Sequence, residues 1–145
     1  MFEILYILLQ EAHASMEAAL IEESAQRNQP ISILTDARHG WRKNSRQTDV
    51  VCLGAEHKRI ISIQTVTHSD DPVAQRHERI GTVRIHDDLA QRAVSICKHC
   101  HDNNASINKL VREQHPEVIN QLDTWHGVKS LVKALTAISQ GAKKS

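Results

Sequence analysis

Aromatic residues are scarce in this chain, whose 145 residues include only two Trp, one Tyr and one Phe. An excess of one charge sign is also missing, because 18 Lys and Arg nearly balance 17 Asp and Glu. The formal net charge of +1 argues neither for nor against a nucleic-acid partner. The sequence has no internal repeat and no low-complexity linker, so we expect one domain around a single core.

Cysteine is limited to Cys52, Cys97 and Cys100, which cannot all pair within the chain. A disulfide framework is therefore not expected, and a reducing compartment is favoured. Cys97 to His101 (CKHCH) matches the C-x-x-C-H pattern of haem attachment, but that chemistry needs export, and a strand would point the two cysteines to opposite faces.

Zinc is the other metal that these residues suggest. Cys97 and Cys100 could bind it together with two of the nearby histidines, His99, His101, His115 and His126. No second C-x-x-C and no regular pair of histidines supports such a site. We therefore expect the cysteines to be small residues in or near the core. Ten histidines should raise the net charge below about pH 6.5.

A long hydrophobic run is missing at the N-terminus. The apolar stretch Ile4–Leu9 follows Glu3, lacks a basic flank and is too short to span a bilayer. Residues 1–27 are instead rich in Leu, Ala, Glu and Gln and predict a helix. We therefore expect a protein that is neither secreted nor inserted in a membrane.

Three strands are predicted next. Pro30 leads into the β-branched run Ile31–Leu34, which predicts a buried strand that ends at Asp36. Val50–Leu53 and Arg59–Thr67 predict two more strands, joined by a turn over 54–58. Short connections between successive strands favour an antiparallel meander.

The remainder alternates between helices and strands. Ser69–Pro72 predicts the start of a helix that runs to about Arg92, although Gly81 weakens it. Ala93–Cys100 predicts a fourth strand, and Asn103 or Asn104 could cap a helix to about Gln114. A short strand at 118–119 and an amphipathic helix follow; the apolar residues of that helix are Val128, Leu131, Val132, Leu135 and Ile138.

This order fits an α/β fold with an RNase H-like mixed sheet over 28–141, preceded by the helix of 1–27 and followed by a basic tail over 142–145. In that fold the first and fourth strands are neighbours, so Asp36 and Asp102 would meet at their ends. Two carboxylates that close repel each other unless a hard cation lies between them. The alternative is that both aspartates only begin a turn or a helix.

Four segments resemble a family of eukaryotic DDE-type transposase-derived proteins, which have an RNase H-like catalytic core. They are 36–44 (DARHGWRKN), 70–82 (DDPVAQRHERIGT), 101–112 (HDNNASINKLVR) and 120–134 (NQLDTWHGVKSLVKA). The likeness covers roughly residues 30–141. It implies a nuclear, domesticated transposon protein whose ancestor cut and joined DNA strands with Mg²⁺ or Mn²⁺.

By this resemblance Asp36 and Asp102 match the first two catalytic, metal-binding acids. The family's third acid comes later, but no Asp or Glu follows Asp123 here, and Asn103 replaces an expected arginine. The resemblance thus implies a truncated core that is inactive alone. Asp123 could substitute as a third ligand, or it could cap the following helix; its place before that helix favours the cap.

Basic side chains follow Asp36 directly. Arg38, Arg42 and Lys43 could neutralise DNA phosphates, and Trp41 among them could stack on a base. DNA is therefore the expected partner, with a homo-oligomer as a further option and no small-molecule cofactor. A non-catalytic module that binds nucleic acid or protein is the alternative function, and a small zinc-binding domain is a weaker one.

Overall fold

The computed structural model describes residues 2–25, 29–40 and 46–124, and also residues 128, 132, 133, 135 and 136. The elements in chain order are α1 (Phe2–Ala25), β1 (Ile31–His39), β2 (Gln47–Gly54), β3 (Ile60–Thr67), a 3₁₀ turn η1 (Ala74–Arg76), α2 (His77–Gln91), β4 (Ile96–His101), α3 (Ala105–Gln114) and β5 (Ile119–Leu122). The predicted α/β class and the N-terminal helix are confirmed.

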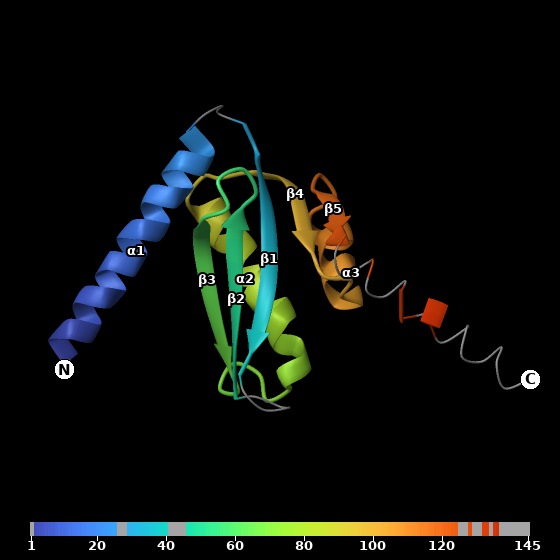
Figure 1. Cartoon of the computed structure of the whole chain (residues 1–145), viewed down its shortest axis with the longest axis horizontal. Coiled ribbons are helices and arrows are strands. Elements are labelled where there is room, and N and C mark those ends of the chain that lie inside the picture. The colour runs from blue at the N-terminus through green and yellow to red at the C-terminus, as the bar shows by residue number, and fades with distance from the viewer. Residues whose placement is uncertain are drawn as a thin grey trace, which may run out of the picture.

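The five strands form one mixed sheet in the order β3-β2-β1-β4-β5 (Figure 1). β1, β2 and β3 pair antiparallel, which confirms the predicted meander. The chain then crosses over, so that β4 pairs parallel with β1 and β5 pairs parallel with β4. The first and fourth strands are therefore neighbours, as expected, and the topology is compatible with an RNase H-like sheet.

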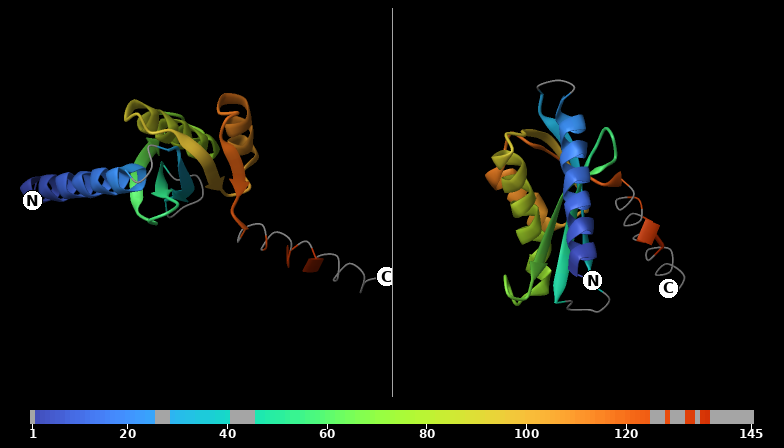
Figure 2. Two further views of the ribbon diagram at one scale, coloured as in Figure 1. Left: turned by 90° about the horizontal axis from the view of Figure 1, so that it is seen from above. Right: turned by 90° about the vertical axis from the view of Figure 1, so that its left-hand side faces the viewer.

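One face of the sheet carries the core, because α2 and α3 pack against it (Figure 2). Side chains from β1, β2, β3 and α2 meet there with little or no exposure; they include Ile33, Val50, Cys52, Ile61, Ile85 and Leu89. A smaller cluster holds α3 against the connection to β5 and consists of Ile107, Val111 and Val118. Parallel strands joined by helices require this cover on at least one face.

α1 joins the body of the protein only near its C-terminal end. Ala19, Leu20 and Glu23 are buried, whereas the residues from Phe2 to Leu9 are exposed, and the helix extends past β3 (Figures 1 and 2). Leu20 packs with the core while Glu23 accepts hydrogen bonds from the backbone amides of Glu56 and His57 at 2.8 and 3.1 Å. The turn between β2 and β3 is thereby fastened to α1.

Several predicted boundaries were wrong. β2 begins at Gln47 and not at Val50, and β5 is Ile119–Leu122 and not 118–119. β1 does not end at Asp36, because pairing with β2 carries the strand on to His39. Pro72 does not start α2, because the residues predicted to cap the helix form turns instead. The Asp70 carboxylate accepts a hydrogen bond from the Thr67 amide, and the Asp71 carboxylate accepts one from the Val73 amide. Ala93 is not in β4, because its backbone turns with φ of 58°.

The predicted cap of α3 was right. Asn104 has extended backbone angles, and its side-chain oxygen accepts the amide of Ser106 at 2.9 Å. The same side chain donates to Glu78 of α2 at 2.7 Å. Asn104 therefore starts α3 and ties it to α2, immediately after the strand that ends beside Asp102.

Candidate functional site: a row of aspartates at the strand ends

Asp36 lies on the face of the sheet opposite to the core. Side chains alternate along a strand, so Ile33 and Thr35 point into the protein while Leu34, Asp36 and Arg38 point out. Asp36 is exposed and pairs with Val51 of β2. It is therefore a solvent-facing carboxylate inside a strand, and the prediction that it follows the strand is corrected.

The sheet register aligns three aspartates. Leu34 of β1 pairs with Cys100 of β4, and Cys100 pairs with Gln121 of β5. Continued by two residues, the register sets Asp36, Asp102 and Asp123 in one row across three parallel strands. We call these three residues the aspartate row. Asp36 lies within β1, whereas Asp102 and Asp123 directly follow β4 and β5, which run parallel to β1.

The backbone at Asp102 is held firmly. Its carbonyl accepts a hydrogen bond from the amide of Asn104 at 2.6 Å and another from Nδ1 of His101. One residue earlier, the carbonyl of His101 accepts the amide of Asp123 at 2.8 Å. The ends of β4 and β5 are thus joined, which keeps two members of the row on adjacent strands.

The pKa of the Cys100 thiol reflects the negative charge near the aspartate row. Its pKa is raised, first by burial and then by the negative charges of Asp123 and Asp102, while Lys58 and Lys98 oppose the shift. Within the described part of the chain, no three His, Cys, Asp or Glu side chains are arranged closely enough to hold one metal ion. Among the described residues, the aspartate row therefore does not form a ready-made site with three side-chain ligands.

The predicted DNA-contacting residues are only partly described. Arg38 is exposed on the same face as Asp36, two residues further along β1. Trp41, Arg42 and Lys43 lie outside the described residues, as do Trp125 and His126. Lys98 lies on this face of β4 too, opposite Ser32. Strand alternation puts Lys98 and Asp102 on the same face, and this pattern in the sequence could have identified Lys98 as a basic residue of the site.

Four histidines cluster on the covered face, directly behind this row. His86 of α2, His99 and His101 of β4, and His115 after α3 lie within ring–ring distances of 4.1 to 5.1 Å. His99 Nε2 lies 2.7 Å from the hydroxyl of Thr35, and its Nδ1 lies 3.2 Å from Nε2 of His86. We call these residues the histidine cluster. The sequence suggested His99, His101 and His115 as candidate zinc ligands, but it did not predict His86 or the stacking of the rings.

Burial controls the chemistry of this cluster. Burial and the neighbouring His115 lower the pKa of His86 to about 4. Burial, together with His86, His101 and His115, lowers the pKa of His99 to about 3. Both rings are therefore neutral at pH 7. Neutral, hydrogen-bonded histidines support β4 from behind and act as core residues.

A second chain of hydrogen-bonded histidines lies at the carboxyl end of β1, where His39 pairs with Thr48 of β2. His77 is fully buried and donates from Nε2 to the carbonyl of Asp71 at 2.6 Å. Its Nδ1 then accepts from the Thr48 hydroxyl at 3.3 Å, and that oxygen accepts from Nδ1 of His39 at 2.9 Å. The chain fixes the tautomers of both imidazoles and ties α2 to β1 and β2.

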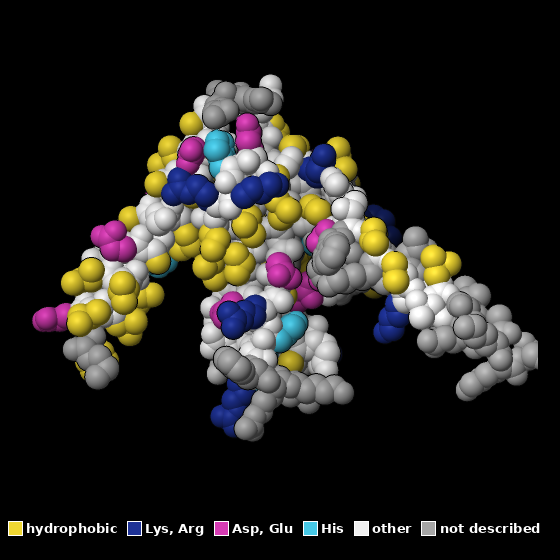
Figure 3. Space-filling model, viewed as in Figure 1, with side chains coloured by type: hydrophobic (Ala, Val, Ile, Leu, Met, Phe, Trp, Pro, Cys, Tyr) yellow, Lys and Arg dark blue, Asp and Glu magenta, His cyan; other side chains and the backbone are white. Residues whose placement is uncertain are grey.

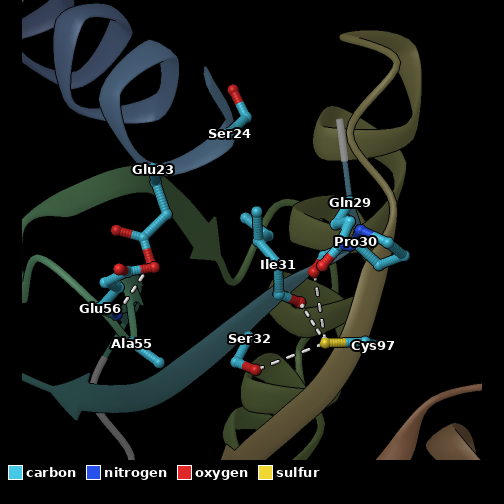
Figure 4. Close-up of a pocket in the computed structure, with 9 residues that line it drawn as sticks. All are labelled: Glu23, Ser24, Gln29, Pro30, Ile31, Ser32, Ala55, Glu56 and Cys97. Atoms are coloured by element: carbon cyan, nitrogen blue, oxygen red, sulfur yellow. Dashed lines mark hydrogen bonds between the residues drawn. The ribbon is translucent and has the colours of Figure 1, made fainter. Parts of the chain in front are cut away.

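The cysteines occupy separate environments. Cys52 is buried in the core, and burial raises the pKa of its thiol. Cys97 lines a cavity of about 450 Å³ between the end of α1, β1 and the turn after β2 (Figure 4). Its sulfur lies 3.4 Å from the carbonyls of Pro30 and Ile31. Cys100 lies on the outer face, so the two cysteines of the C-x-x-C run do not converge.

The same cavity contains the carboxylate of Glu23, already engaged by the turn after β2 (Figure 4). Nδ1 of His57 lies 2.8 Å from Glu23 Oε2. A side chain on Gly54 would collide with this carboxylate, since its Cβ would lie 2.3 Å from Glu23 Cδ. The cavity is therefore the joint that attaches α1, and its acid and thiol have structural roles.

Comparison of the sequence with protein-family models and with curated proteins gave no match in either case.

Proposed function

We propose that this chain is a domain with an RNase H-like fold, related to DDE-type transposases, that binds a divalent cation and nucleic-acid phosphates. The observation that carries the proposal is the parallel β1–β4 register, which pairs Leu34 with Cys100, so that its continuation by two residues would bring Asp36 beside Asp102. Strand order β3-β2-β1-β4-β5, with a helix in each crossover, supports the fold assignment. The four segments quoted above support the relation to transposases.

The donor atoms suit Mg²⁺ or Mn²⁺. These cations prefer carboxylate oxygens and keep several waters, so two or three aspartates and solvent are an adequate ligand set. Asp36 and Asp102 are the proposed ligands, and Asp123 is the third carboxylate of the row. When bound, such a cation polarises a phosphoryl oxygen or activates a water. The chain's own contribution is to fix the Asp102 backbone and to keep Asp36 exposed.

Basic residues beside the row would receive the nucleic acid. Arg38 and Lys98 lie on the same face as the aspartates, and each can neutralise a phosphate without reading sequence. Trp41, Arg42 and Lys43 belong to the proposed contact surface by their sequence position. The partner that this arrangement favours is DNA, and the family relation favours a nuclear location.

Cation binding is tested by titrating Mn²⁺ into the purified chain and into two variants, Asp36→Asn and Asp102→Asn. We expect each variant to bind at least about tenfold more weakly, since losing one charged ligand of two or three removes much of the attraction. Asp87→Asn is the matched control, because Asp87 is exposed on α2 across the sheet. Equal affinity in Asp36→Asn and the unaltered chain would overturn the cation site.

Cleavage is a separate question. The resemblance matches only Asp36 and Asp102 to the three acids of the family, so we propose that these residues retain cation and DNA binding without efficient strand cutting. Incubation with supercoiled DNA and Mg²⁺ or Mn²⁺ is expected to leave the plasmid intact. Robust cleavage that Asp36→Asn abolishes would show instead that this chain is an active nuclease.

A non-catalytic module that binds nucleic-acid phosphates without a cation is the second candidate function, favoured by the exposure of Arg38. Arg38→Ala should weaken DNA binding and reduce the slope of log affinity against log salt by about 0.9, the value expected for one lost phosphate contact. Arg112→Ala is the control, because Arg112 is exposed on α3, behind the sheet. An unchanged slope in Arg38→Ala would argue for a protein-interaction module.

A further inference from the structure

A closed ring of hydrogen bonds surrounds the connection between β4 and α3. In it, Nδ1 of the His101 imidazole donates to the carbonyl of Asp102, and Nε2 lies 2.7 Å from Oδ1 of Asn120 on β5. Nδ2 of Asn120 donates to Oδ1 of Asn108 on α3 at 2.8 Å, and Nδ2 of Asn108 donates to Oδ1 of Asn103 at 3.2 Å. Asn103 follows Asp102 in the chain, so the contacts return to their starting point. We call these residues the asparagine ring.

The asparagine ring lies behind the aspartate row, on the side of the sheet that α3 covers. His101 is 2% exposed, and Asn120 pairs with the fully buried His99. The opposite, outer face is the one seen in Figure 3, where acidic side chains are visible near its middle. Alternation along β4 and its continuation puts Asp102 on that outer face and His101 on the covered one. The asparagine ring therefore holds the backbone of Asp102 without occupying the surface that a cation would approach.

We propose that Asn120 is a positioning residue for the cation site, because its side chain closes the asparagine ring and thereby fixes the backbone from which Asp102 projects. This role rests on the proposed function, in which Asp102 binds the cation. An amide offers an oxygen and an NH₂ group together, so Asn120 satisfies His101 and Asn108 at once. It thus joins the strand before Asp102 to the helix after it. The partners of metal ligands set the orientation of those ligands, and their loss weakens metal binding.

Two backbone amides report on the order of this connection. The amide of Asn104 donates to the carbonyl of Asp102 at 2.6 Å, and that of Asp123 donates to the carbonyl of His101 at 2.8 Å. Both hydrogen bonds end on residues that the asparagine ring holds. If Asn120 positions Asp102, opening the ring must loosen these bonds before any cation is added. Amide hydrogen exchange therefore separates the positioning role from cation binding.

Asn120→Leu removes the amide groups and keeps a side chain of similar size. Without a cation, we expect the amides of Asn104 and Asp123 to exchange at least about tenfold faster in this variant, measured by NMR, because its bonds to His101 and Asn108 are lost. Asn120→Asp is the conservative variant, since a carboxylate accepts from His101 and from Asn108 once that amide turns over. It should exchange within about threefold of the unaltered chain. Unchanged exchange in Asn120→Leu would overturn the positioning role.

Mn²⁺ titration gives the second readout. We expect Asn120→Leu to bind Mn²⁺ about tenfold more weakly than the unaltered chain, and Asn120→Asp to recover most of the loss. Asn108→Ala opens the same ring at a helical position where alanine is favourable, so weaker binding there cannot come from a weakened helix. Ser62→Ala is the matched control, because it removes the hydrogen bond from the buried Ser62 on β3 to Asp88. This control should lower stability and leave the Mn²⁺ affinity unchanged.

The outcomes distinguish the role of Asn120 from the cation site itself. If Asp102→Asn weakens Mn²⁺ binding while Asn120→Leu binds as tightly as the unaltered chain, the cation site stands and the positioning role is overturned. If the unaltered chain binds no Mn²⁺, the proposed function fails, and the positioning role fails with it even where hydrogen exchange changes. A lower free energy of unfolding in Asn120→Leu at unchanged Mn²⁺ affinity would show a purely structural role and equally overturn the proposal.

Discussion

Gly81 shows at the residue scale why a glycine is kept inside a helix. A Cβ at this position would lie 2.4 Å from Cγ2 and 2.9 Å from Cβ of Val50, on the strand beneath. Glycine weakens a helix, and for that reason Gly81 made the sequence prediction of α2 less clear. In the structure it allows α2 to approach β2 closely. The local helical preference is therefore overruled by packing in the core.

The substitution Gly81→Ala has two opposing effects on the free energy of unfolding, and the size of each is known. Alanine favours the helix by about 1 kcal/mol, whereas forcing a methyl group into a filled core typically costs about 1–3 kcal/mol. We expect a net loss of roughly 1 kcal/mol in the free energy of unfolding, measured by urea denaturation. The same substitution should do less harm in a Val50→Ala background, where the new methyl group has space. A gain in stability in the native background would contradict this account.

The histidine cluster joins three elements, because α2, β4 and the end of α3 each contribute rings. His86 and His99 must stay neutral to remain there, and burial lowers the pKa of each, to about 4 and about 3. In the unfolded chain both would titrate near 6.5. Below that pH the unfolded state binds more protons than the native state, so stability falls as the pH falls.

Stability should therefore decline from about pH 6.5 down to about pH 4, by about 1.4 kcal/mol per pH unit for each of these two histidines at most. Below pH 4, His86 also protonates in the folded protein and its share of the slope ends. Urea denaturation at a series of pH values measures this dependence.

The hydrogen bond between His57 and Glu23 has the opposite effect on the pH dependence of stability. A hydrogen bond to Glu23 raises the pKa of His57, so its stabilising contribution is present at low pH and is lost as the pH rises. To isolate the cluster, His86→Gln should flatten the decline between pH 6.5 and 4, whereas His13→Gln, exposed on α1, should leave it unchanged. Identical slopes in both variants would refute the assignment.

The sequence predicted those elements that depend on near neighbours. Alternating β-branched residues indicated β2 and β3, and Asn104 was recognised as a cap because its oxygen bonds an amide two residues away. The expectation that Asp36 lies beside Asp102 came only from the expected fold order. The structure shows that β1 and β4 are parallel neighbours, paired as far as Leu34 and Cys100.

Features that need distant partners were missed or misplaced. Asp36 lies inside β1 because β2 offers pairing as far as His39, which residue preferences alone do not reveal. The histidine cluster joins residues 13 and 64 positions apart, as in His86–His99 and Thr35–His99. Nothing in the local pattern around these histidines distinguishes a buried ring from an exposed one.

At the scale of the whole molecule, the apolar end of α1 is a prominent exposed hydrophobic feature among the residues that the structure describes. By length and composition alone this helix could cross a membrane, but Ala19, Leu20 and Glu23 near its end are buried against the domain. A crossing that used its full length would have to release these contacts. The exposed apolar residues of the first turns favour association of the protein.

Leu5→Glu with Leu8→Glu tests this feature, since the two side chains are 56% and 60% exposed. We expect less self-association in sedimentation experiments and a free energy of unfolding changed by no more than about 0.5 kcal/mol, as for ordinary surface substitutions. Leu20→Glu, at a position only 3% exposed, should destabilise the protein strongly. A comparable loss of stability in the double variant would show that the first turns are packed.

Because β1 lies in the centre of the sheet, the backbones of the three residues of the aspartate row are held in different ways. Asp36 is carried by a strand whose backbone is paired with β2 at that residue and with β4 just before it. Asp102 instead begins the connection to α3, and Asp123 begins the segment after β5. Any ligand that draws the three carboxylates together would therefore meet one residue fixed by strand pairing and two whose backbones are held by hydrogen bonds within the connections. Most of the entropy lost on binding would then fall on the three side chains.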